Sequence, residues 1–149
     1  MVDRSDAEPV EVLLDLTAAP SAAPDRRVHA WRFPLTHASV PAVRRALRPF
    51  VARAGLSDDE ADDLVLATCE AATNVVEHAK WSTEAYYDVT FDSAGADVVI
   101  SVRDHGRWET NRTPFGSGGR GLSMMMSLAE VTLMSGPVGT TVTLRKLRP

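Results

Sequence analysis

Two carboxylates and one carboxamide recur along the stretch EAATNVVEHAK, residues 70–80. On a helix, at about 100° per residue, Glu70, Asn74 and Glu77 share one narrow arc and apolar residues fill the opposite side. A carboxylate and a carboxamide one turn apart suit Mg²⁺, which takes one or two protein oxygens and completes its octahedron with water and phosphate oxygens. The spacing therefore predicts a site for magnesium and a nucleotide. The alternative is the solvated face of an ordinary amphipathic helix.

A second candidate is the run GSGGRGL at residues 116–122, where four glycines fall within six positions. Clustered glycines before a helix let backbone N–H groups converge on an anion, and the helix N-terminus adds partial positive charge. Arg120 could add a phosphate contact from within the loop. The run fits neither GxxxxGK[ST] nor a GxGxxG that directly follows a strand, which excludes the ordinary P-loop and Rossmann folds. A flexible surface loop is the alternative interpretation.

The length and composition predict one compact domain. The chain has 149 residues, 44% of them hydrophobic, enough to bury roughly two thirds of the unfolded surface. No apolar run approaches the ~20 residues that cross a bilayer, and the N-terminus lacks the pattern of a signal peptide, so we expect a cytoplasmic protein without a membrane partner. The single cysteine, Cys69, excludes an internal disulfide framework and a cysteine metal cluster.

The net charge of −4 is concentrated near the N-terminus. Residues 1–26 carry six of the twenty acidic residues and two of the sixteen basic ones, so the rest of the chain is electrically balanced. A nucleic-acid binder would show a basic excess, which argues against direct binding of nucleic acid. We expect residues 1–27 to form an acidic, Ala/Pro-rich tail or linker before a domain at 28–149. Within the tail, Val10–Leu16 is either a sticky patch or the closing strand of a preceding domain.

The first elements of the domain are predicted to be an edge strand and a helix. Alternation over Val28–Leu35 indicates a strand with one apolar side, and Pro34, which cannot donate to a ladder, places it at a sheet edge. Ser39 offers an N-cap for a helix that runs to about Ala54 and that Gly55 ends. The basic side of this helix is either solvated surface or a docking surface for an acidic partner; it carries Arg44, Arg45 and Arg48.

A second helix, of about 22 residues, is predicted to begin at Ser57. Ser57 and Glu60 form a capping box, and the acidic residues between Asp58 and Asp63 lie near the positive end of the helix dipole. We therefore assign these acids to the helix start rather than to a metal cluster. The second half of this helix carries the pair Glu70 and Asn74.

Four strands and a short helix complete a predicted order of β-α-α-β-β-α-β-β. The helix is expected from about Leu122 to Leu128, and the strands are expected at Ala85–Phe91, Asp97–Arg103, Glu130–Ser135 and Thr140–Leu147. The strand at Asp97–Arg103 is almost continuously apolar and β-branched, which predicts a central place in the sheet. It ends at Asp104-His105-Gly106.

Four motifs follow one another: Glu-x-x-x-Asn on a helix, a strand ending in Asp-x-Gly, a glycine loop that opens a helix, and a strand pair with Gly-Thr-Thr. Together they resemble the GHKL (Bergerat-fold) ATPase superfamily and, within it, the bacterial anti-sigma-factor serine/threonine kinases, whose N box is similar to EAATNVVEHA. The resemblance covers about Val28 to Leu147. It implies an α+β two-layer sandwich with a mixed, mainly antiparallel sheet covered on one face by helices.

The resemblance also implies roles for the matching residues. Asn74 resembles the asparagine that coordinates magnesium, and Glu70 resembles the general base that accepts a proton from a serine hydroxyl or from water. Asp104, with Gly106 beside it, resembles the aspartate that bonds the adenine amine. His78 is interpreted as a local structural residue. The other ATP-binding residues that the resemblance implies are Gly118, Gly119, Arg120, Gly121 and Leu122 at the phosphates and Thr141 near the adenine.

The function implied by the resemblance is an enzyme with ATP and Mg²⁺ as cofactors. Such a kinase sequesters a sigma factor, phosphorylates a serine on an antagonist of the anti-sigma factor, and is expected to form a homodimer. One departure is Trp108, which stands where the family pattern Asp-x-Gly-x-Gly has its final glycine. Trp108 either covers the adenine or marks a subgroup with weakened use of ATP. The alternative function is therefore a non-catalytic protein-binding module with weak or absent turnover.

Overall fold

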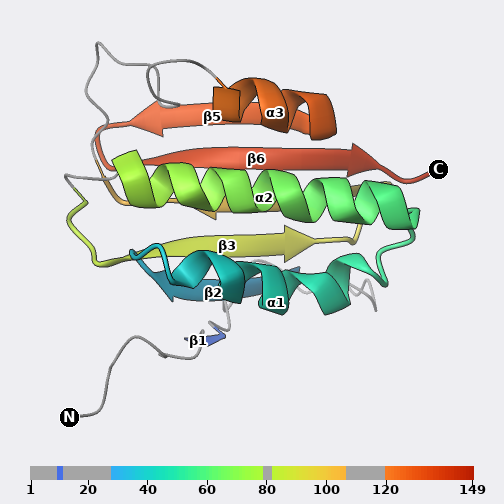
Figure 1. Cartoon of the computed structure of the whole chain (residues 1–149), viewed down its shortest axis with the longest axis horizontal. Coiled ribbons are helices and arrows are strands. Elements are labelled where there is room, and N and C mark those ends of the chain that lie inside the picture. The colour runs from blue at the N-terminus through green and yellow to red at the C-terminus, as the bar shows by residue number, and fades with distance from the viewer. Residues whose placement is uncertain (1–9, 12–27, 79–81, 107–119) are drawn as a thin grey trace, which may run out of the picture.

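The computed structural model describes residues 10–11, 28–78, 82–106 and 120–149 of the chain. Figure 1 shows the elements of this part. The strands and helices in chain order are β1 (Val10–Glu11), β2 (Val28–Pro34), α1 (Ser39–Val51), α2 (Asp58–His78), β3 (Tyr86–Asp92), β4 (Asp97–Arg103), α3 (Arg120–Leu128), β5 (Glu130–Gly136) and β6 (Gly139–Leu147).

The three helices cover one face of a six-stranded sheet (Figure 1). The strand order is β1-β2-β3-β4-β6-β5, which confirms the central position predicted for β4. Every strand pair in the described residues is antiparallel. The predicted α+β fold class is confirmed, but the parallel pairing that a mixed sheet implies does not occur among these strands. None of α1, α2 and α3 has the length and apolar composition of a membrane-spanning helix.

The strand β2 is not the edge strand that Pro34 predicted. The two residues of β1 pair with Trp31 and Arg32, so β2 lies between β1 and β3. Pro34 is accommodated because it is the last residue of β2, where a missing N–H removes a donor only at the end of the ladder. Of the segment Val10–Leu16, residues 12–16 lie outside the described part.

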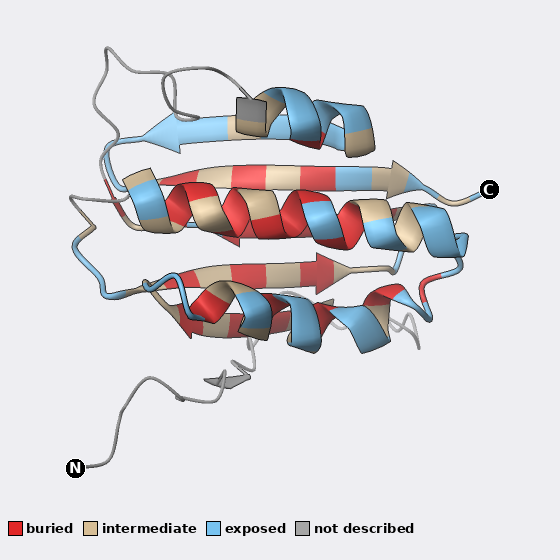
Figure 2. Cartoon of the chain, viewed as in Figure 1, coloured by how far each residue is buried: buried red, intermediate tan, exposed pale blue. Residues whose placement is uncertain are grey.

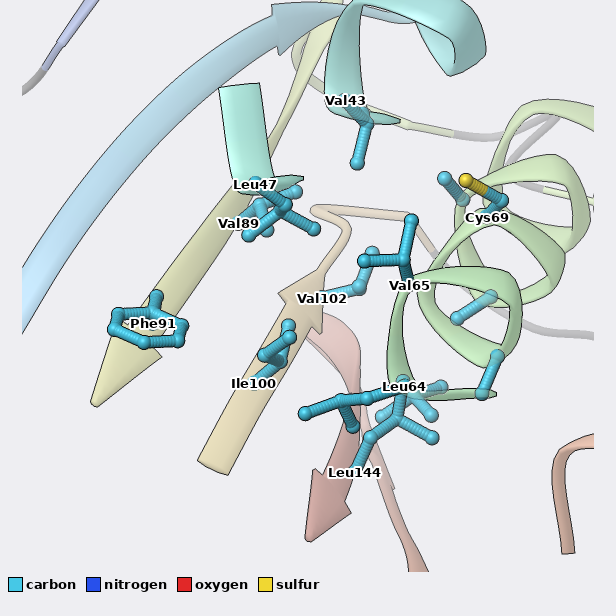
Figure 3. Packing of buried hydrophobic residues seen from close by; sticks show 14 of the residues in the cluster. Val43, Leu47, Leu64, Val65, Cys69, Val89, Phe91, Ile100, Val102 and Leu144 are labelled. Carbon is cyan, nitrogen blue, oxygen red and sulfur yellow. The ribbon is translucent and has the colours of Figure 1, made fainter. Parts of the chain in front are cut away.

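The hydrophobic core lies between the sheet and the helices (Figures 2 and 3). Strand alternation sends every second side chain of β2, β3, β4 and β6 toward α1 and α2. The largest of these side chains are almost fully buried: Phe33, Tyr87, Phe91, Ile100 and Leu144. From the helices, Figure 3 shows Val43, Leu47, Leu64 and Val65 pointing into the same layer.

The start of α1 differs from the prediction. Ala38, not Ser39, is the N-cap residue, and no side chain caps this helix. The buried Ser39 hydroxyl instead donates to the backbone oxygen of Thr36 at 2.7 Å and lies 2.6 Å from the Tyr87 hydroxyl. Burial raises the pKa of Tyr87 to about 12, so the phenol remains neutral near pH 7 and ties α1 to β3.

The start of α2 confirms the capping box. The Ser57 backbone N–H donates to Glu60 Oε2 at 2.9 Å, and the Glu60 backbone N–H donates to Ser57 Oγ at 3.2 Å. Gly55 precedes this box with φ of +83°, a conformation that glycine adopts without steric cost. The resulting helix runs for 21 residues and lies along the direction of the strands (Figure 1).

Candidate functional site

Four elements bring predicted site residues to one end of the molecule. The helix α2 ends there, and α3, which runs antiparallel to it, begins there (Figure 1). The strand β4 also ends where β6 begins, because Arg103 pairs with Thr141. Asn74 of α2, Asp104 after β4, Gly121 of α3 and the first residues of β6 therefore share this end.

The carboxamide of Asn74 faces the first turn of α3. Asn74 is 8% exposed, and its Nδ2 is buried without a hydrogen-bond partner in the described part of the chain. A Cβ atom added to Gly121 would lie 3.1 Å from Asn74 Nδ2 and 3.4 Å from Oδ1, so Gly121 lies directly against the amide. Leaving a buried polar group unpaired costs about 1–3 kcal/mol. A group retained in that state requires an explanation, such as a bound ion.

The donor set fits magnesium held largely by other ligands. Among the described residues, no three His, Cys, Asp or Glu side chains gather as a metal site. A cation at Asn74 would therefore depend on phosphate and water oxygens for most of its coordination, as Mg²⁺ in nucleotide sites does. The oxygen and nitrogen of the amide differ by a rotation about one bond, so either atom can face the first turn of α3.

Glu70 lies one helical turn before Asn74, is partly exposed, and makes no hydrogen bond or ion pair within the described residues. Its carboxylate is thus available to accept a proton from a group outside the chain. Glu77, the third member of the predicted polar arc, is exposed, and its Oε2 lies 3.9 Å from His78 Nε2. The arc is therefore divided between a buried amide and two more exposed carboxylates.

The side chain of Asp104 is fully buried and held in one orientation. Its Oδ1 accepts the backbone N–H of Gly106 at 3.1 Å and that of Thr140 at 3.0 Å. The Asp104 backbone N–H donates to the Thr140 oxygen at 2.9 Å, so β4 and β6 are joined by both main chain and side chain. A Cβ atom on Gly139 would lie 2.3 Å from the Asp104 backbone oxygen, so this approach requires glycine.

The geometry brings Thr140, rather than the predicted Thr141, to Asp104. Thr140 is 1% exposed, and its Oγ1 lies 3.1 Å from Ser135 Oγ. Strand alternation directs the Thr141 side chain to the opposite face of the sheet. Sequence reasoning missed Thr140, although the apolar Val142 and Leu144 mark the covered face of β6 and share its alternation.

His105 holds the same loop from the opposite face of the sheet. Its Nε2 lies 3.2 Å from Asp88 Oδ2, and Asp88 is also paired with Arg32 at 2.9 Å. The His105 backbone oxygen accepts the N–H of Thr83 at 3.3 Å and its hydroxyl at 3.2 Å. Asp104 and Gly106 are therefore fixed by contacts on both sides, as a preorganised binding site requires.

The remaining predicted residues are less completely described. Gly118, Gly119 and Trp108 lie outside the described residues, as does the side chain of Arg120, whose backbone begins α3. Leu122 is partly buried and packs against the core. The predicted phosphate loop thus remains a prediction, and of its glycines the structure describes Gly121 alone.

Comparison with known proteins gives two results. The family model described as the histidine kinase-like ATPase domain matches residues 33–146. The fold is also similar to a crystal structure of the RsbU and RsbW domains of Rv1364c from Mycobacterium tuberculosis, with a TM-score of 0.62 and 29% sequence identity over 80% of the present chain. This match covers 33% of the solved chain. Since the family model spans most of the sequence, the chain belongs to the family of histidine kinase-like ATPase domains.

Proposed function

We propose that this chain binds ATP with Mg²⁺ and transfers the γ-phosphoryl group to a serine hydroxyl of a partner protein. The observation that carries the proposal is the buried, unpaired Asn74 amide against Gly121 at the start of α3. A helix start offers unpaired backbone N–H groups and partial positive charge to a phosphate. The ATPase family of the chain supports ATP as the nucleotide.

Each residue has a distinct part in this proposal. Bound Mg²⁺ would neutralise phosphate charge, with Asn74 as its protein ligand, and Asp104 would orient the adenine. Glu70 accepts the serine proton while the serine oxygen forms a bond to the γ-phosphorus and the bond from that phosphorus to the β–γ bridging oxygen breaks, releasing ADP. General-base assistance of this kind contributes about 10²- to 10⁴-fold, and positioning supplies most of the rest.

We further propose that the chain acts as an anti-sigma-factor kinase and functions as a homodimer. It would sequester a sigma factor and phosphorylate a serine on an anti-sigma-factor antagonist. The motif resemblance and the similarity to a structure with an RsbW domain support this assignment. The exposed basic side of α1 also suits an acidic partner; Arg44, Arg45 and Arg48 make no ion pair within the described residues.

Two substitutions on α2 test the catalytic assignment. Glu70→Ala is expected to retain ATP binding and to lose about 10²-fold or more of phosphoryl transfer, because it removes only the proton acceptor. Asn74→Ala is expected to lose Mg²⁺-dependent binding and transfer together. Binding is measured calorimetrically with and without Mg²⁺, and transfer is measured with γ-labelled ATP and a candidate antagonist.

Asp62→Asn is the matched control, since it neutralises an exposed acid on the same helix away from Asn74. Undiminished transfer in Glu70→Ala would remove the base from the proposal, and undiminished Mg²⁺-dependent binding in Asn74→Ala would remove the metal ligand.

The second candidate function is a non-catalytic module that sequesters a protein partner. The sequence position of Trp108, in place of a family glycine, favours it. This candidate predicts a stoichiometric complex with the antagonist and no label transfer from ATP. The same incubation therefore separates the two functions.

A further inference from the structure

The position of α3 along α2 determines the phosphate end of the proposed site, because Gly121 lies against Asn74. Three apolar side chains of this nine-residue helix pack in or against the core. Met125 is its one fully buried side chain among the described residues, Leu122 and Leu128 are partly buried, and Figure 2 shows that most of the helix surface is exposed. A polar interaction adds to this apolar packing and fixes the position of the helix along its axis.

That interaction lies at the opposite end of α3. The Lys146 Nζ of β6 donates to the backbone oxygen of Leu128 at 2.7 Å and to Asp63 Oδ2 at 3.3 Å. Leu128 is the last residue of α3, where carbonyl groups lack helical partners and a cation is favoured by the helix dipole. Asp63 belongs to the first half of α2. One ammonium group thus joins the end of α3, the beginning of α2 and the sheet.

Lys146 is well placed for this role because of its position in β6. It pairs with the buried Val98 and shares the covered face of the sheet with Leu144 by alternation. Its side chain is 18% exposed, so solvent competes little for its hydrogen bonds. Leu128 lies seven positions after Gly121, about 10 Å along α3, and the backbone hydrogen bonds between them transmit a fixed position from one end of the helix to the other.

We propose that Lys146 is a positioning residue that fixes α3 along α2 and thereby sets the distance between the first turn of α3 and the Asn74 carboxamide. The inference deepens the proposed nucleotide function and rests on it for its effect on binding. Lys146 does not touch the nucleotide. Its removal should weaken contacts at the phosphates and spare contacts at the adenine, because Asp104 and Thr140 are joined to each other independently of α3.

The test compares ATP-Mg²⁺ with adenosine on the full chain. Lys146→Met, which keeps the aliphatic stem, is expected to raise the Kd for ATP-Mg²⁺ roughly 3- to 30-fold and to leave the Kd for adenosine unchanged. Lys146→Arg is expected to restore ATP-Mg²⁺ binding. Arg145→Met is the matched control, because Arg145 neighbours Lys146 in β6, points to the uncovered face of the sheet and loses an ion pair with Asp97 of β4. Equal affinities of Lys146→Met and the parent for ATP-Mg²⁺, or equal losses for both ligands, would overturn the proposal.

Amide hydrogen exchange without nucleotide provides a second measurement. Lys146→Met should exchange faster in α3 and at the parent rate in β4 and in the second half of α2, because the Lys146 side chain bonds the end of α3 and, in α2, only Asp63 in the first half. Unchanged exchange in α3 would contradict the positioning role. If the parent chain binds no ATP, the proposed function fails, and the exchange experiment still decides whether Lys146 holds α3.

Discussion

At the scale of single residues, the site depends on where side chains are absent as much as on where they are present. Gly121 has no side chain to separate α3 from Asn74, and Gly139 has none to separate β6 from the Asp104 backbone. The two glycines are not equivalent. A Cβ at Gly139 would meet immovable backbone, whereas one at Gly121 would meet a side-chain amide.

Gly121→Ala should therefore weaken nucleotide binding without destabilising the fold. Alanine is favoured over glycine in a helix by about 1 kcal/mol, so the free energy of unfolding should stay constant or rise. The new methyl group would displace the Asn74 carboxamide, and Mg²⁺-dependent ATP affinity should fall roughly 10- to 100-fold, as for other groups that position a metal ligand. Calorimetric binding and urea unfolding measure the two effects. Ser123→Ala, at an exposed position of the same helix, is the control, and parent-like ATP affinity in Gly121→Ala would contradict the placement of Asn74.

The sequence predicted individual residues well where local periodicity decides their direction. Asn74 and Glu70 could be placed one turn apart on α2 because helical spacing alone fixes that relation. Thr140 could not be distinguished from Thr141 by the motif, since the choice depends on which face of β6 the helices cover. The contacts of Lys146 could not be predicted for a similar reason, because its partners, Asp63 and Leu128, are distant in sequence.

At the scale of elements, those with local start and stop signals were predicted most accurately. The capping box of Ser57 and Glu60 lies within four consecutive residues, and both of its hydrogen bonds are present. The helix α1 begins differently because the Ser39 hydroxyl has a better partner in Tyr87, which is 48 positions away in sequence. Likewise β2 is not the predicted edge strand, because two residues of β1 pair with it. No local sequence pattern predicts that pairing.

The capping box predicts a pH dependence of stability. The hydrogen bond from the Ser57 backbone lowers the pKa of Glu60 below its ordinary value of 4.5. Because the folded pKa lies below the unfolded one, this stabilisation is fully present above pH 4.5 and is lost as the pH falls through the folded pKa. Glu60→Gln should therefore lower the melting temperature at pH 7, and the difference from the parent should shrink below pH 4.5. Thermal melts from pH 7 to pH 3 measure this difference in melting temperature. Asp59→Asn is the control for removal of a negative charge alone. A melting-temperature difference between Glu60→Gln and the parent that stays constant with pH would exclude stabilisation by the ionised Glu60 carboxylate.

At the scale of the whole molecule, the fold holds the two sides of the proposed site by different means. The Asp104 side is fixed within the sheet by bonds among β3, β4 and β6. The Asn74 side is made by the last turns of α2 and the first turn of α3, and among the described side chains of α3 only Met125 is fully buried. Hydrophobic periodicity predicted the order of elements, and the motif resemblance implied the mainly antiparallel sheet. Neither could predict this difference between the two sides, which depends on contacts between distant elements.

A ligand that bridges both sides should stabilise the whole chain. ATP-Mg²⁺ at 100 times its Kd is expected to add about 2.7 kcal/mol to the free energy of unfolding, which for a domain of this size raises the melting temperature by roughly 5–10 °C. ATP with a chelator should give a smaller rise, and Asn74→Ala should lose the difference between the two conditions. Scanning calorimetry measures the shifts. No shift with ATP-Mg²⁺ at any concentration would contradict nucleotide binding by this end of the fold.

The junction between β4 and β6 has a consequence for the order in which a cell makes the site. A ribosome releases residues 28–106 before β6, yet β6 lies inside the sheet, between β4 and β5. Until β6 arrives, the nascent chain exposes the edge of its most apolar strand, and Asp104 lacks the Thr140 N–H that orients it. The Asp104 side of the proposed site is therefore complete only once β6 has paired with β4, and until then the exposed strand edge can pair with another chain.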